Sequence, residues 1–247
     1  IHLDPNISNQ NGSCGICANN RFFLQNIFEE LDAPNEWYYD KDQKLLYFYS
    51  PIGENINNLV SIPITDKILS FKNAHDLIFD GLIVEEVDAN ADYYNGAIWI
   101  ESSKFITIKN SIIKNTMDLG IYGLHIKNVI IDNNEIAYTG GYAIEIRNAT
   151  AEYNKLEKSN LKITNNNVHD TSSVKIWGGA AISLEKIVGS TIAYNHIYNA
   201  PRVGIYFTGN DNDIEYNYIH DINQKTEDSS AIYTQGAPNW PSWGNII

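Results

Sequence analysis

Five carboxylate side chains lie in or ahead of a short phrase that the sequence repeats. Glu145 and Glu185 stand in two successive copies of this phrase, "YAIEIR" and "AAISLE". Asp118 lies ahead of the copy "YGLHIK", and Glu227 and Asp228 lead into the copy "SAIYTQ". A pair of carboxyl groups can cleave a glycosidic bond, one as the proton donor and the other as the nucleophile or the base. These five residues are therefore the candidate catalytic groups.

Aromatic, basic and polar side chains occur in the same phrase, whose other copies read "GAIWIE" and "VGIYFT". Alternation predicts that every second residue of a strand points outward. Aromatic rings at such positions stack on sugar rings, and arginine binds hydroxyl or uronate groups. The predicted outward row is Trp99, His125, Glu145, Ser183, Tyr206 and Tyr233, and the next outward row is Glu101, Lys127, Arg147, Glu185, Thr208 and Gln235. The candidate substrate-binding residues are Trp99, His125, Arg147, Arg202, Tyr206 and Tyr233.

Small residues precede the outward row in every copy of the phrase. Because small side chains leave space beside larger neighbours, they predict a groove that is open enough for a sugar chain. These residues are Ala97, Gly123, Ala143, Ala181, Gly204 and Ala231.

Two other functions fit the same residues. A polysaccharide lyase removes the proton next to a uronate carboxyl group, with Arg202 or Lys127 as the base. Asp228, Glu227 and Glu185 would then bind a Ca²⁺ ion. A glycan-binding solenoid without catalytic activity would use the same outward row. The sequence has no compact acidic cluster typical of a dedicated calcium site, so for hydrolysis we expect no metal and no cofactor.

A second phrase, which places Asn between two aliphatic residues, recurs in "NLKITNNNVHD", "STIAYNHIYN" and "DIEYNYIHD". Measured at its last aliphatic residue, successive copies lie 30, 23, 32, 29 and 22 residues apart. A unit of this length with strands and turns is a coil of a β-solenoid, because a propeller blade needs about 40 to 45 residues. The last aliphatic residues are Ile83, Ile113, Ile136, Val168, Ile197 and Ile219. Five residues earlier stand Ile78, Ile108, Ile131, Ile163, Ile192 and Ile214. Two residues before the last aliphatic residue stands the polar column, which consists of Gly81, Ser111, Asn134, Asn166, Asn195 and Asn217.

These periods predict an all-β chain that folds as a right-handed parallel β-helix, with coils of about 22 to 30 residues. In the first phrase, the residues predicted to face the core are Ile98, Leu124, Ile144, Ile182, Ile205 and Ile232.

The first 70 residues do not repeat, and they predict a separate part of the chain. Two aromatic-rich segments, "EWYYD" and "KLLYFYS", flank the turn "KDQK" and predict a hairpin that caps or flanks the solenoid. We therefore expect an N-terminal part over residues 1–70 and a β-helix over residues 71–247. The last residues, "WGNII", match the start of another coil, so we expect the gene product to continue beyond Ile247.

Composition and charge restrict the class of protein. Asn occurs 32 times, and Asn favours tight turns. The net charge of −13 argues against nucleic-acid binding and against an anionic membrane surface. No apolar run approaches the roughly 18 residues of a membrane helix. An acidic protein of this kind is expected to be secreted or periplasmic. Cys14 and Cys17 in "CGIC" are expected to be structural or incidental, with a local disulfide or a redox function as the alternatives.

Three segments carry a resemblance to a known family: "FEELDAPNEWYYDKDQKLLYFYSP", "YNHIYNAPRVGIYFTGNDNDIEYNYIHDI", and "TEDSSAIYT" followed by a Trp-containing turn. In this order they resemble the right-handed β-helix proteins near glycoside hydrolase family 141, over residues 19–245. The resemblance implies hydrolysis of plant- or algal-wall polysaccharides of the xylan or pectin type, and it implies a catalytic acid at Asp228. The sequence departs from the family pattern at Asn199 (usually Asp), Arg202 (usually His) and Ser230 (usually Gly), and an expected Arg is absent near "TQGAPNW".

Overall fold

The computed structural model describes residues 26–40, 42–51, 60, 62–88, 95–148, 156–235 and 242–247. The chain forms two compact units, Ile1–Ser61 and Ile62–Ile247. Strand β3 (Leu69–Lys72) pairs in parallel with a strand of the next coil, so the repeating part begins before residue 71, which was the boundary expected from the sequence. The cysteines at positions 14 and 17 lie outside the described residues.

The first unit contains the predicted hairpin. Strands β1 (Trp37–Asp40) and β2 (Leu45–Phe48) pair antiparallel. A short 3₁₀ helix, η2 (Phe28–Glu30), places the Phe28 ring edge-on against Tyr38 and Tyr47, with centroid distances of 5.2 and 5.1 Å. These ring contacts form a small apolar cluster within this unit.

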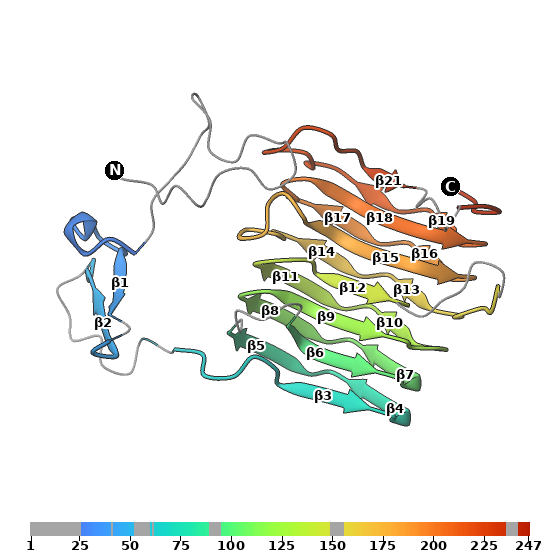
Figure 1. Ribbon diagram of the computed structural model, residues 1–247, viewed down its shortest axis with the longest axis horizontal. Coiled ribbons are helices and arrows are strands. Elements are labelled where there is room, and N and C mark those ends of the chain that lie inside the picture. Colours follow the sequence, from blue (N-terminus) through green and yellow to red (C-terminus); the bar gives the residue numbers. More distant parts are fainter. Residues whose placement is uncertain are drawn as a thin grey trace, which may run out of the picture. The chain divides into compact units, whose positions relative to one another are not determined.

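In the described part of the chain, the second unit forms three parallel sheets, which Figure 1 shows as a stack of coils. Sheet I contains β3, β6 (Gly96–Glu101), β9 (Leu119–Leu124), β12 (Ile144–Arg147), β15 (Ala180–Val188), β18 (Val203–Asn210) and β21 (Ile232–Thr234). Sheet II contains β4 (His75–Asp80), β7 (Lys104–Lys109), β10 (Ile130–Asp132), β13 (Lys162–Thr164), β16 (Thr191–Ala193) and β19 (Asp213–Glu215). Sheet III contains β5 (Ile83–Val87), β8 (Ile112–Thr116), β11 (Glu135–Thr139), β14 (Asn167–His169), β17 (His196–Tyr198) and β20 (Tyr218–Ile219).

Neighbouring strands of each sheet come from successive coils, which confirms the predicted parallel β-helix. Each coil passes from sheet I to sheet II and then to sheet III before the next coil begins.

Aliphatic side chains from the three sheets fill the interior of the solenoid. The predicted column of sheet II is in register from Ile108 to Ile214, and each member is at most 2% exposed. The predicted column of sheet III is fully buried from Ile113 to Ile197. Burial of one such side chain contributes about 1.5–3 kcal/mol, so these columns are the main source of stability.

The first coil differs from the sequence prediction by one residue. Phe79 and Val84 join the aliphatic columns and pack against the core. Ile78 and Ile83, which were predicted to face inward, are 69% and 65% exposed. The cause is Gly81, which the sequence prediction placed in the polar column. Its φ of +72° shows that it occupies the left-handed corner position, which lies one residue before that column.

The third coil differs from the prediction by three residues. In β9, Ile121 occupies the position predicted for Leu124, and Tyr122 occupies the position predicted for His125. Gly120 fixes this register, because a Cβ atom there would lie 2.6 Å from a backbone carbonyl oxygen of the next coil. His125 follows the end of the strand, so its predicted place in the outward row of sheet I is wrong.

Five of the six small residues predicted to open a groove are buried and leave no space beside the outward row, so their predicted role is wrong; Ala231, just before β21, is exposed. Ala97, Ala143 and Ala181 are 0% exposed and belong to the core. An added Cβ atom at Gly120 or Gly204 would lie 2.9 Å from an isoleucine side chain of sheet III. Small residues are needed here because the chain turns closely from sheet III into sheet I.

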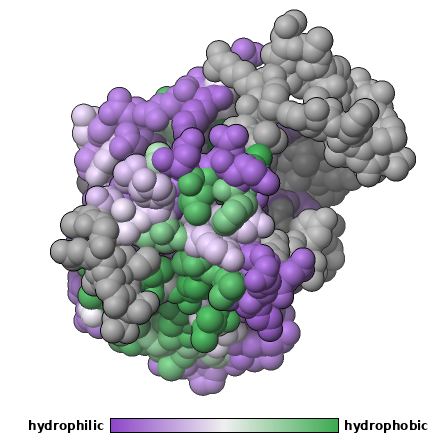
Figure 2. Space-filling view, turned by 90° about the vertical axis from the view of Figure 1, so that its left-hand side faces the viewer, coloured by the Kyte–Doolittle hydropathy of each residue, from purple (hydrophilic) through white to green (hydrophobic). Residues whose placement is uncertain are grey.

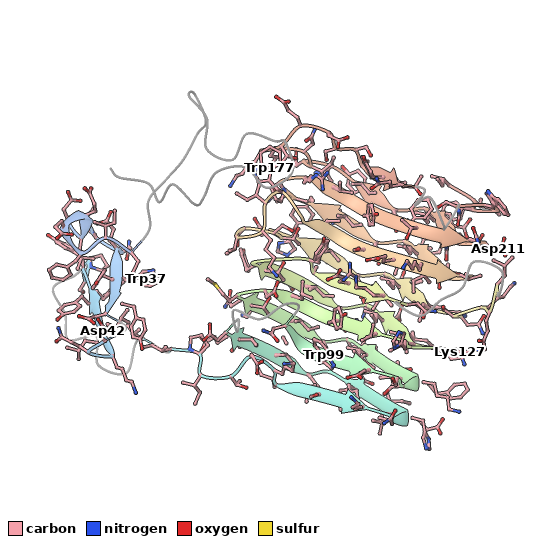
Figure 3. All side chains as sticks on the ribbon, viewed as in Figure 1. Trp37, Asp42, Trp99, Lys127, Trp177 and Asp211 are labelled. Atoms are coloured by element: carbon pink, nitrogen blue, oxygen red, sulfur yellow. The ribbon has the colours of Figure 1, made fainter. Side chains whose placement is uncertain are left out.

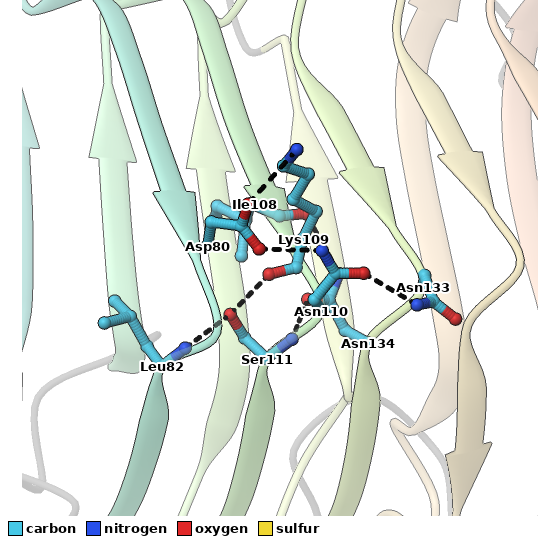
Figure 4. A network of polar contacts seen from close by, with 8 residues as sticks. All are labelled: Asp80, Leu82, Ile108, Lys109, Asn110, Ser111, Asn133 and Asn134. Atoms are coloured by element: carbon cyan, nitrogen blue, oxygen red, sulfur yellow. Dashed lines mark hydrogen bonds and ion pairs between the residues drawn. The ribbon is translucent and has the colours of Figure 1, made fainter.

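A ladder of polar side chains connects the coils between sheets II and III, and Figure 4 shows its beginning. The Asn134 Nδ2 group donates to the Ile108 carbonyl oxygen and to Asn166 Oδ1, both at 3.0 Å. Asn134 Oδ1 accepts a hydrogen bond from the Ser111 backbone N–H at 3.0 Å. Asn166 and Asn195 repeat this pattern in the following coils. The predicted Asn column thus satisfies corner backbone groups that no strand reaches.

A second row of asparagines lies one residue before this ladder, at the corner itself. Asn110 and Asn133 have φ values of +52° and +53°, a left-handed conformation that Asn tolerates better than most residues. Their side chains connect successive coils, because Asn133 Nδ2 donates to Asn110 Oδ1 and Asn110 Nδ2 donates to Asp80 Oδ1, both at 2.7 Å. The abundance of Asn therefore has a conformational cause as well as a hydrogen-bonding one.

Aromatic and imidazole rings stack along the outer side of sheet III. His169, Tyr198 and His220 follow one another with centroid distances of 4.8 and 5.2 Å and interplanar angles of 10° and 1°. His196 stacks on Tyr218 at 5.0 Å in the neighbouring column. Because the rings cover one another's faces, this cluster stabilises the stack of coils.

Large hydrophobic side chains are also exposed to solvent. Figure 2 shows a face on which hydrophobic side chains lie next to hydrophilic ones. Ile78 and Phe105 are 69% and 48% exposed and line a shallow depression over sheet II. Scattered apolar residues of this kind are normal on protein surfaces.

Replacement of Asn166 by Ala tests the ladder. The variant loses both donors of a side chain that is 1% exposed, and it leaves the Asn134 backbone N–H without its acceptor. We expect the free energy of unfolding to fall by about 3 kcal/mol, measured by urea denaturation. The control is Asn165→Gly, which removes an exposed amide but keeps the left-handed conformation, and which should cost less than about 1 kcal/mol. Equal losses in both variants would contradict the role of the ladder.

Candidate active site

A pocket of about 320 Å³ lies over strands β12, β15, β18 and β21 of sheet I. The strand register places Glu145, Ser183, Tyr206 and Tyr233 in one row, as the sequence predicts for these four residues. Loop residues that precede β15, β18 and β21 complete the lining. The full lining is Tyr142, Glu145, Arg147, Gly178, Gly179, Ala180, Ser183, Glu185, Arg202, Val203, Tyr206, Asp228, Tyr233 and Gln235.

Glu145 is the buried acid of this pocket. Its side chain is 2% exposed, and its Oε2 atom has no hydrogen-bond partner among the described residues. Burial raises the pKa of the Glu145 carboxyl group to about 7, and the nearby Glu185 and Asp118 carboxylates add to the rise, while Arg147 and Lys175 oppose it. Near neutral pH this carboxyl group can therefore hold a proton and release it.

Arg147 connects Glu145 to the next coil. Its Nε atom lies 3.3 Å from Glu145 Oε1 and donates a hydrogen bond of 2.6 Å to Glu185 Oε2, which also contacts Nη2 of the same guanidinium group. A planar guanidinium group that holds a carboxylate through two nitrogens fixes its orientation. The geometry thus joins one buried acid and one ion-paired carboxylate in a single cluster.

Asp118 lies beneath the pocket and does not line it. Its side chain is 4% exposed, accepts a hydrogen bond of 3.0 Å from the Asn95 backbone N–H, and pairs with Lys175 Nζ at 2.8 Å. Asp118 therefore acts on the pocket through its charge, which raises the pKa of Glu145.

Arg202 and Asp228 meet at the rim of the pocket. The Arg202 Nη2 atom donates to the Asp228 carbonyl oxygen at 3.3 Å and lies 3.9 Å from Asp228 Oδ2. The Asp228 side chain is 77% exposed, and its Oδ1 atom accepts a hydrogen bond of 3.3 Å from the Tyr233 hydroxyl group. The Arg202 Nε atom is buried and has no hydrogen-bond partner among the described residues. The same is true of the Oγ atom of Ser229, which follows Asp228.

Tyr206 and Tyr233 form the aromatic part of the lining. Their ring centroids are 6.1 Å apart, with an interplanar angle of 28°. Burial raises the pKa of the Tyr206 hydroxyl group, and the Glu185 carboxylate raises it further. Tyr206 therefore keeps its proton near neutral pH and is available as a hydrogen-bond donor.

Besides Asp118, three predicted site residues lie outside the pocket lining. Trp99 stands on β6, two strands from Glu145 in sheet I, and its ring packs against Tyr122 at 4.4 Å and under Lys67 Nζ at 5.1 Å. His125 occupies the corner after β9, with φ of +53°. Glu227 is exposed and does not line the pocket.

The sequence prediction missed Tyr142, Lys175 and the glycines at 178 and 179. Lys175 and the two glycines lie in a loop that follows no period, so the repeat pattern assigned them no position; Tyr142 opens the repeat copy "YAIEIR" but lies outside the predicted outward rows. A Gly-Gly pair after an isolated Trp in "KIWGG" was the only local signal for this loop.

Other features of the structure bear on ligands and location. No three His, Cys, Asp or Glu side chains gather as metal ligands within the described ranges. Glu185, which the lyase hypothesis assigns to calcium, is instead paired with Arg147. No helix in the described part of the chain is long and apolar enough to span a membrane.

Comparison with known proteins identifies the fold family. The family described as "Right handed beta helix region" matches residues 76–243, which agrees with the predicted handedness. No curated protein matches the chain. A solved structure of XylC in complex with xylose is similar, with 15% sequence identity and a TM-score of 0.50. The similarity covers 68% of this chain and 31% of the XylC chain, and it shows the fold alone. The resemblance to glycoside hydrolase family 141 stays a prediction.

The buried acid predicts a pH-dependent stability. In the fold Glu145 has a pKa of about 7, above its ordinary value of 4.5, so the native state keeps a proton that the unfolded chain releases. Stability should therefore fall as the pH rises from about 4.5 through about 7, by about 3 kcal/mol in total. Glu145→Gln binds no such proton. Its free energy of unfolding should therefore not show this fall, so the difference between variant and wild type should shift in favour of the variant as the pH rises over this range. Urea denaturation across the pH series measures the difference, and parallel curves for the two proteins would contradict the raised pKa.

Proposed function

The chain belongs to the right-handed β-helix family, and we propose that its pocket on sheet I hydrolyses a glycosidic bond of a polysaccharide. One observation carries the proposal. Glu145 is a buried carboxylic acid with a pKa of about 7, and its unpartnered oxygen belongs to a residue that lines a polar pocket. A general acid for glycoside hydrolysis needs this raised pKa, because the group must still hold its proton when the substrate binds.

Glu145 donates its proton from Oε2 to the glycosidic oxygen, and the bond between that oxygen and the anomeric carbon breaks. Glu185 is the second carboxylate in this proposal. Glu145 Oε1 and Glu185 Oε2 contact the same Arg147 Nε atom, so their separation cannot exceed the two contact distances of 3.3 and 2.6 Å combined. This limit is shorter than the roughly 6.5 to 9.5 Å of inverting enzymes and includes the roughly 5 Å of retaining ones.

The short separation supports a retaining reaction. Glu185 attacks the anomeric carbon as the nucleophile, and a covalent glycosyl–enzyme intermediate forms as the leaving sugar takes the proton. A water molecule then gives its proton to Glu145 and its hydroxyl group to the anomeric carbon, which releases Glu185. Arg147 holds the two carboxyl groups in place during both steps.

The rim residues bind the sugar in this proposal. Arg202 and Asp228 offer a donor and an acceptor for sugar hydroxyl groups, and Tyr206 and Tyr233 offer ring surface and hydroxyl donors. Asp228, which the family resemblance marks as catalytic, is here the alternative second carboxylate. The proposed substrate is a wall polysaccharide of the xylan or pectin type outside the cytoplasm, and the XylC structure holds xylose.

A polysaccharide lyase is the second candidate function, because one observation favours it. The Arg202 Nε atom is buried without a partner in the same pocket, where a uronate carboxyl group or the proton next to it could meet the guanidinium group. A lyase product carries a new double bond that absorbs ultraviolet light, whereas a hydrolase product carries only a new reducing end. The two functions are therefore separable in one assay.

Glu145→Gln tests the proposed general acid. Soluble xylan and polygalacturonate are incubated with the full chain, and reducing ends and ultraviolet absorbance are followed in parallel. We expect reducing ends without absorbance, and a loss of about a hundredfold or more in kcat for the variant, because the leaving group is no longer protonated. In the wild type, kcat should decline above about pH 7 as Glu145 loses its proton.

Glu101→Gln is the matched control, because Glu101 lies on β6 of the same sheet, pairs with Lys72 and does not line the pocket. It should keep full activity. Activity that survives in Glu145→Gln would reject the assignment, and absorbance lost in Arg202→Ala would replace hydrolysis by the lyase function. Binding without any turnover in the wild type would indicate a glycan-binding solenoid.

A further inference from the structure

The loop between β14 and β15 is held firmly against the preceding coil. The Ser173 backbone N–H donates to the Thr139 carbonyl oxygen at 3.1 Å, and the Lys175 backbone N–H donates to the Gly140 carbonyl oxygen at 2.7 Å. The Lys175 side chain then reaches the buried carboxylate of Asp118. These contacts fix the backbone up to Lys175, two residues before an exposed tryptophan.

Trp177 is the exposed residue of this loop. Its side chain is 69% exposed, and within the described ranges no aromatic ring or cation packs against its indole. The next two residues, Gly178 and Gly179, line the pocket that contains Glu145. Figure 3 shows Trp177 and Trp99 at different levels of the stack of coils. Trp99 has its ring occupied by Tyr122 and Lys67, so it offers less free surface than Trp177 does.

The two glycines connect the tryptophan to the pocket lining. A Cβ atom at Gly179 would lie 2.0 Å from Ser172 Oγ, so the loop closes tightly on itself there. A Cβ atom at Gly178 would meet nothing within 4 Å, so the space beside it is open. The chain therefore places a large, flat, exposed side chain one residue before an open position that lines the pocket.

We infer that Trp177 is a sugar-binding residue that stacks on a pyranose ring next to the pocket and adds a subsite to it. This inference rests on the proposed glycan function. The C–H groups of one face of a pyranose ring pack against an aromatic ring, and an indole offers the largest such surface. A residue outside the reacting pair contributes equally to substrate and transition-state binding, so it lowers KM and leaves kcat unchanged.

The test compares Trp177→Ala and Trp177→Phe in the full chain with xylo-oligosaccharides and galacturonate oligomers as probes. We expect Trp177→Ala to raise KM about fivefold to tenfold with kcat unchanged, and Trp177→Phe to recover most of the loss. The effect should be larger for a long oligomer than for a disaccharide, because only the long one reaches the extra subsite. Thermal unfolding verifies that both variants fold.

Trp243→Ala is the matched control. Trp243 is 64% exposed, but its backbone contacts Asn210 and Asp211 at the opposite end of β18, away from the pocket lining. Its replacement should leave KM unchanged for every oligomer. An equal rise of KM in Trp243→Ala, or an unchanged KM in Trp177→Ala, would overturn the inference.

Binding without turnover separates this inference from the proposed function. Tryptophan fluorescence is titrated with the same oligomers in a Glu145→Gln background. An emission shift that is present with Trp177 and lost in Trp177→Phe supports the stacking role of Trp177, even if no variant hydrolyses the probe. Hydrolysis that depends on Glu145, without such a shift, supports the proposed function and rejects the stacking role of Trp177. If no oligomer shifts the emission or is cleaved, both proposals are overturned.

Discussion

Hydrogen bonding between each coil and the next is the constraint on which the whole β-helix depends. In a parallel sheet, the backbone groups of one strand are satisfied by the strands on either side, about 4.8 Å away. A coil therefore fits only if its strand residues stand above their equivalents in the coil below. Corner backbone groups lie outside the strands, and the side chains of Asn134, Asn166 and Asn195 satisfy them instead. Aliphatic columns and polar ladders are two results of the same stacking.

The candidate site follows from this stacking. Glu145 and Tyr233 are far apart in the sequence, yet the register of sheet I places them in one row, because four successive coils each contribute the equivalent residue. The next row brings Arg147 beside Glu185 in the same way. A buried acid, a guanidinium group and a second carboxylate therefore come together without any local sequence motif. The enclosed position of Glu145, more than any single neighbour, raises its pKa.

Loops supply what the regular coils cannot. Sheet I alone would present flat rows of side chains, whereas the segments before β15, β18 and β21 build a rim around them. Lys175, in the loop before β15, contributes the counter-charge of Asp118, and Arg202 and Asp228 form part of the rim. These segments vary in length between coils because the solenoid constrains only the strands and corners.

The sequence by itself determined the fold, because the period of the aliphatic and Asn residues repeats the one physical unit that stacks. It also identified Glu145, Glu185, Arg147, Tyr206 and Tyr233 as neighbours on one face, since alternation along a strand and register between strands are both readable from spacing. Register errors arose where the pattern was ambiguous. Gly81 resembled a member of the polar column but has the left-handed conformation, and β9 offered two overlapping phrases until the close contact at Gly120 decided between them.

Only the tertiary structure decided which carboxyl group is buried. Burial depends on loops that follow no period, so Asp118, Glu145 and Asp228 looked alike in the sequence. In the fold, Asp118 is paired beneath the pocket, Asp228 is exposed at its rim, and Glu145 is enclosed with a pKa of about 7. The physical reason is that the free energy of a charge depends on its surroundings in three dimensions, which chain spacing alone does not specify.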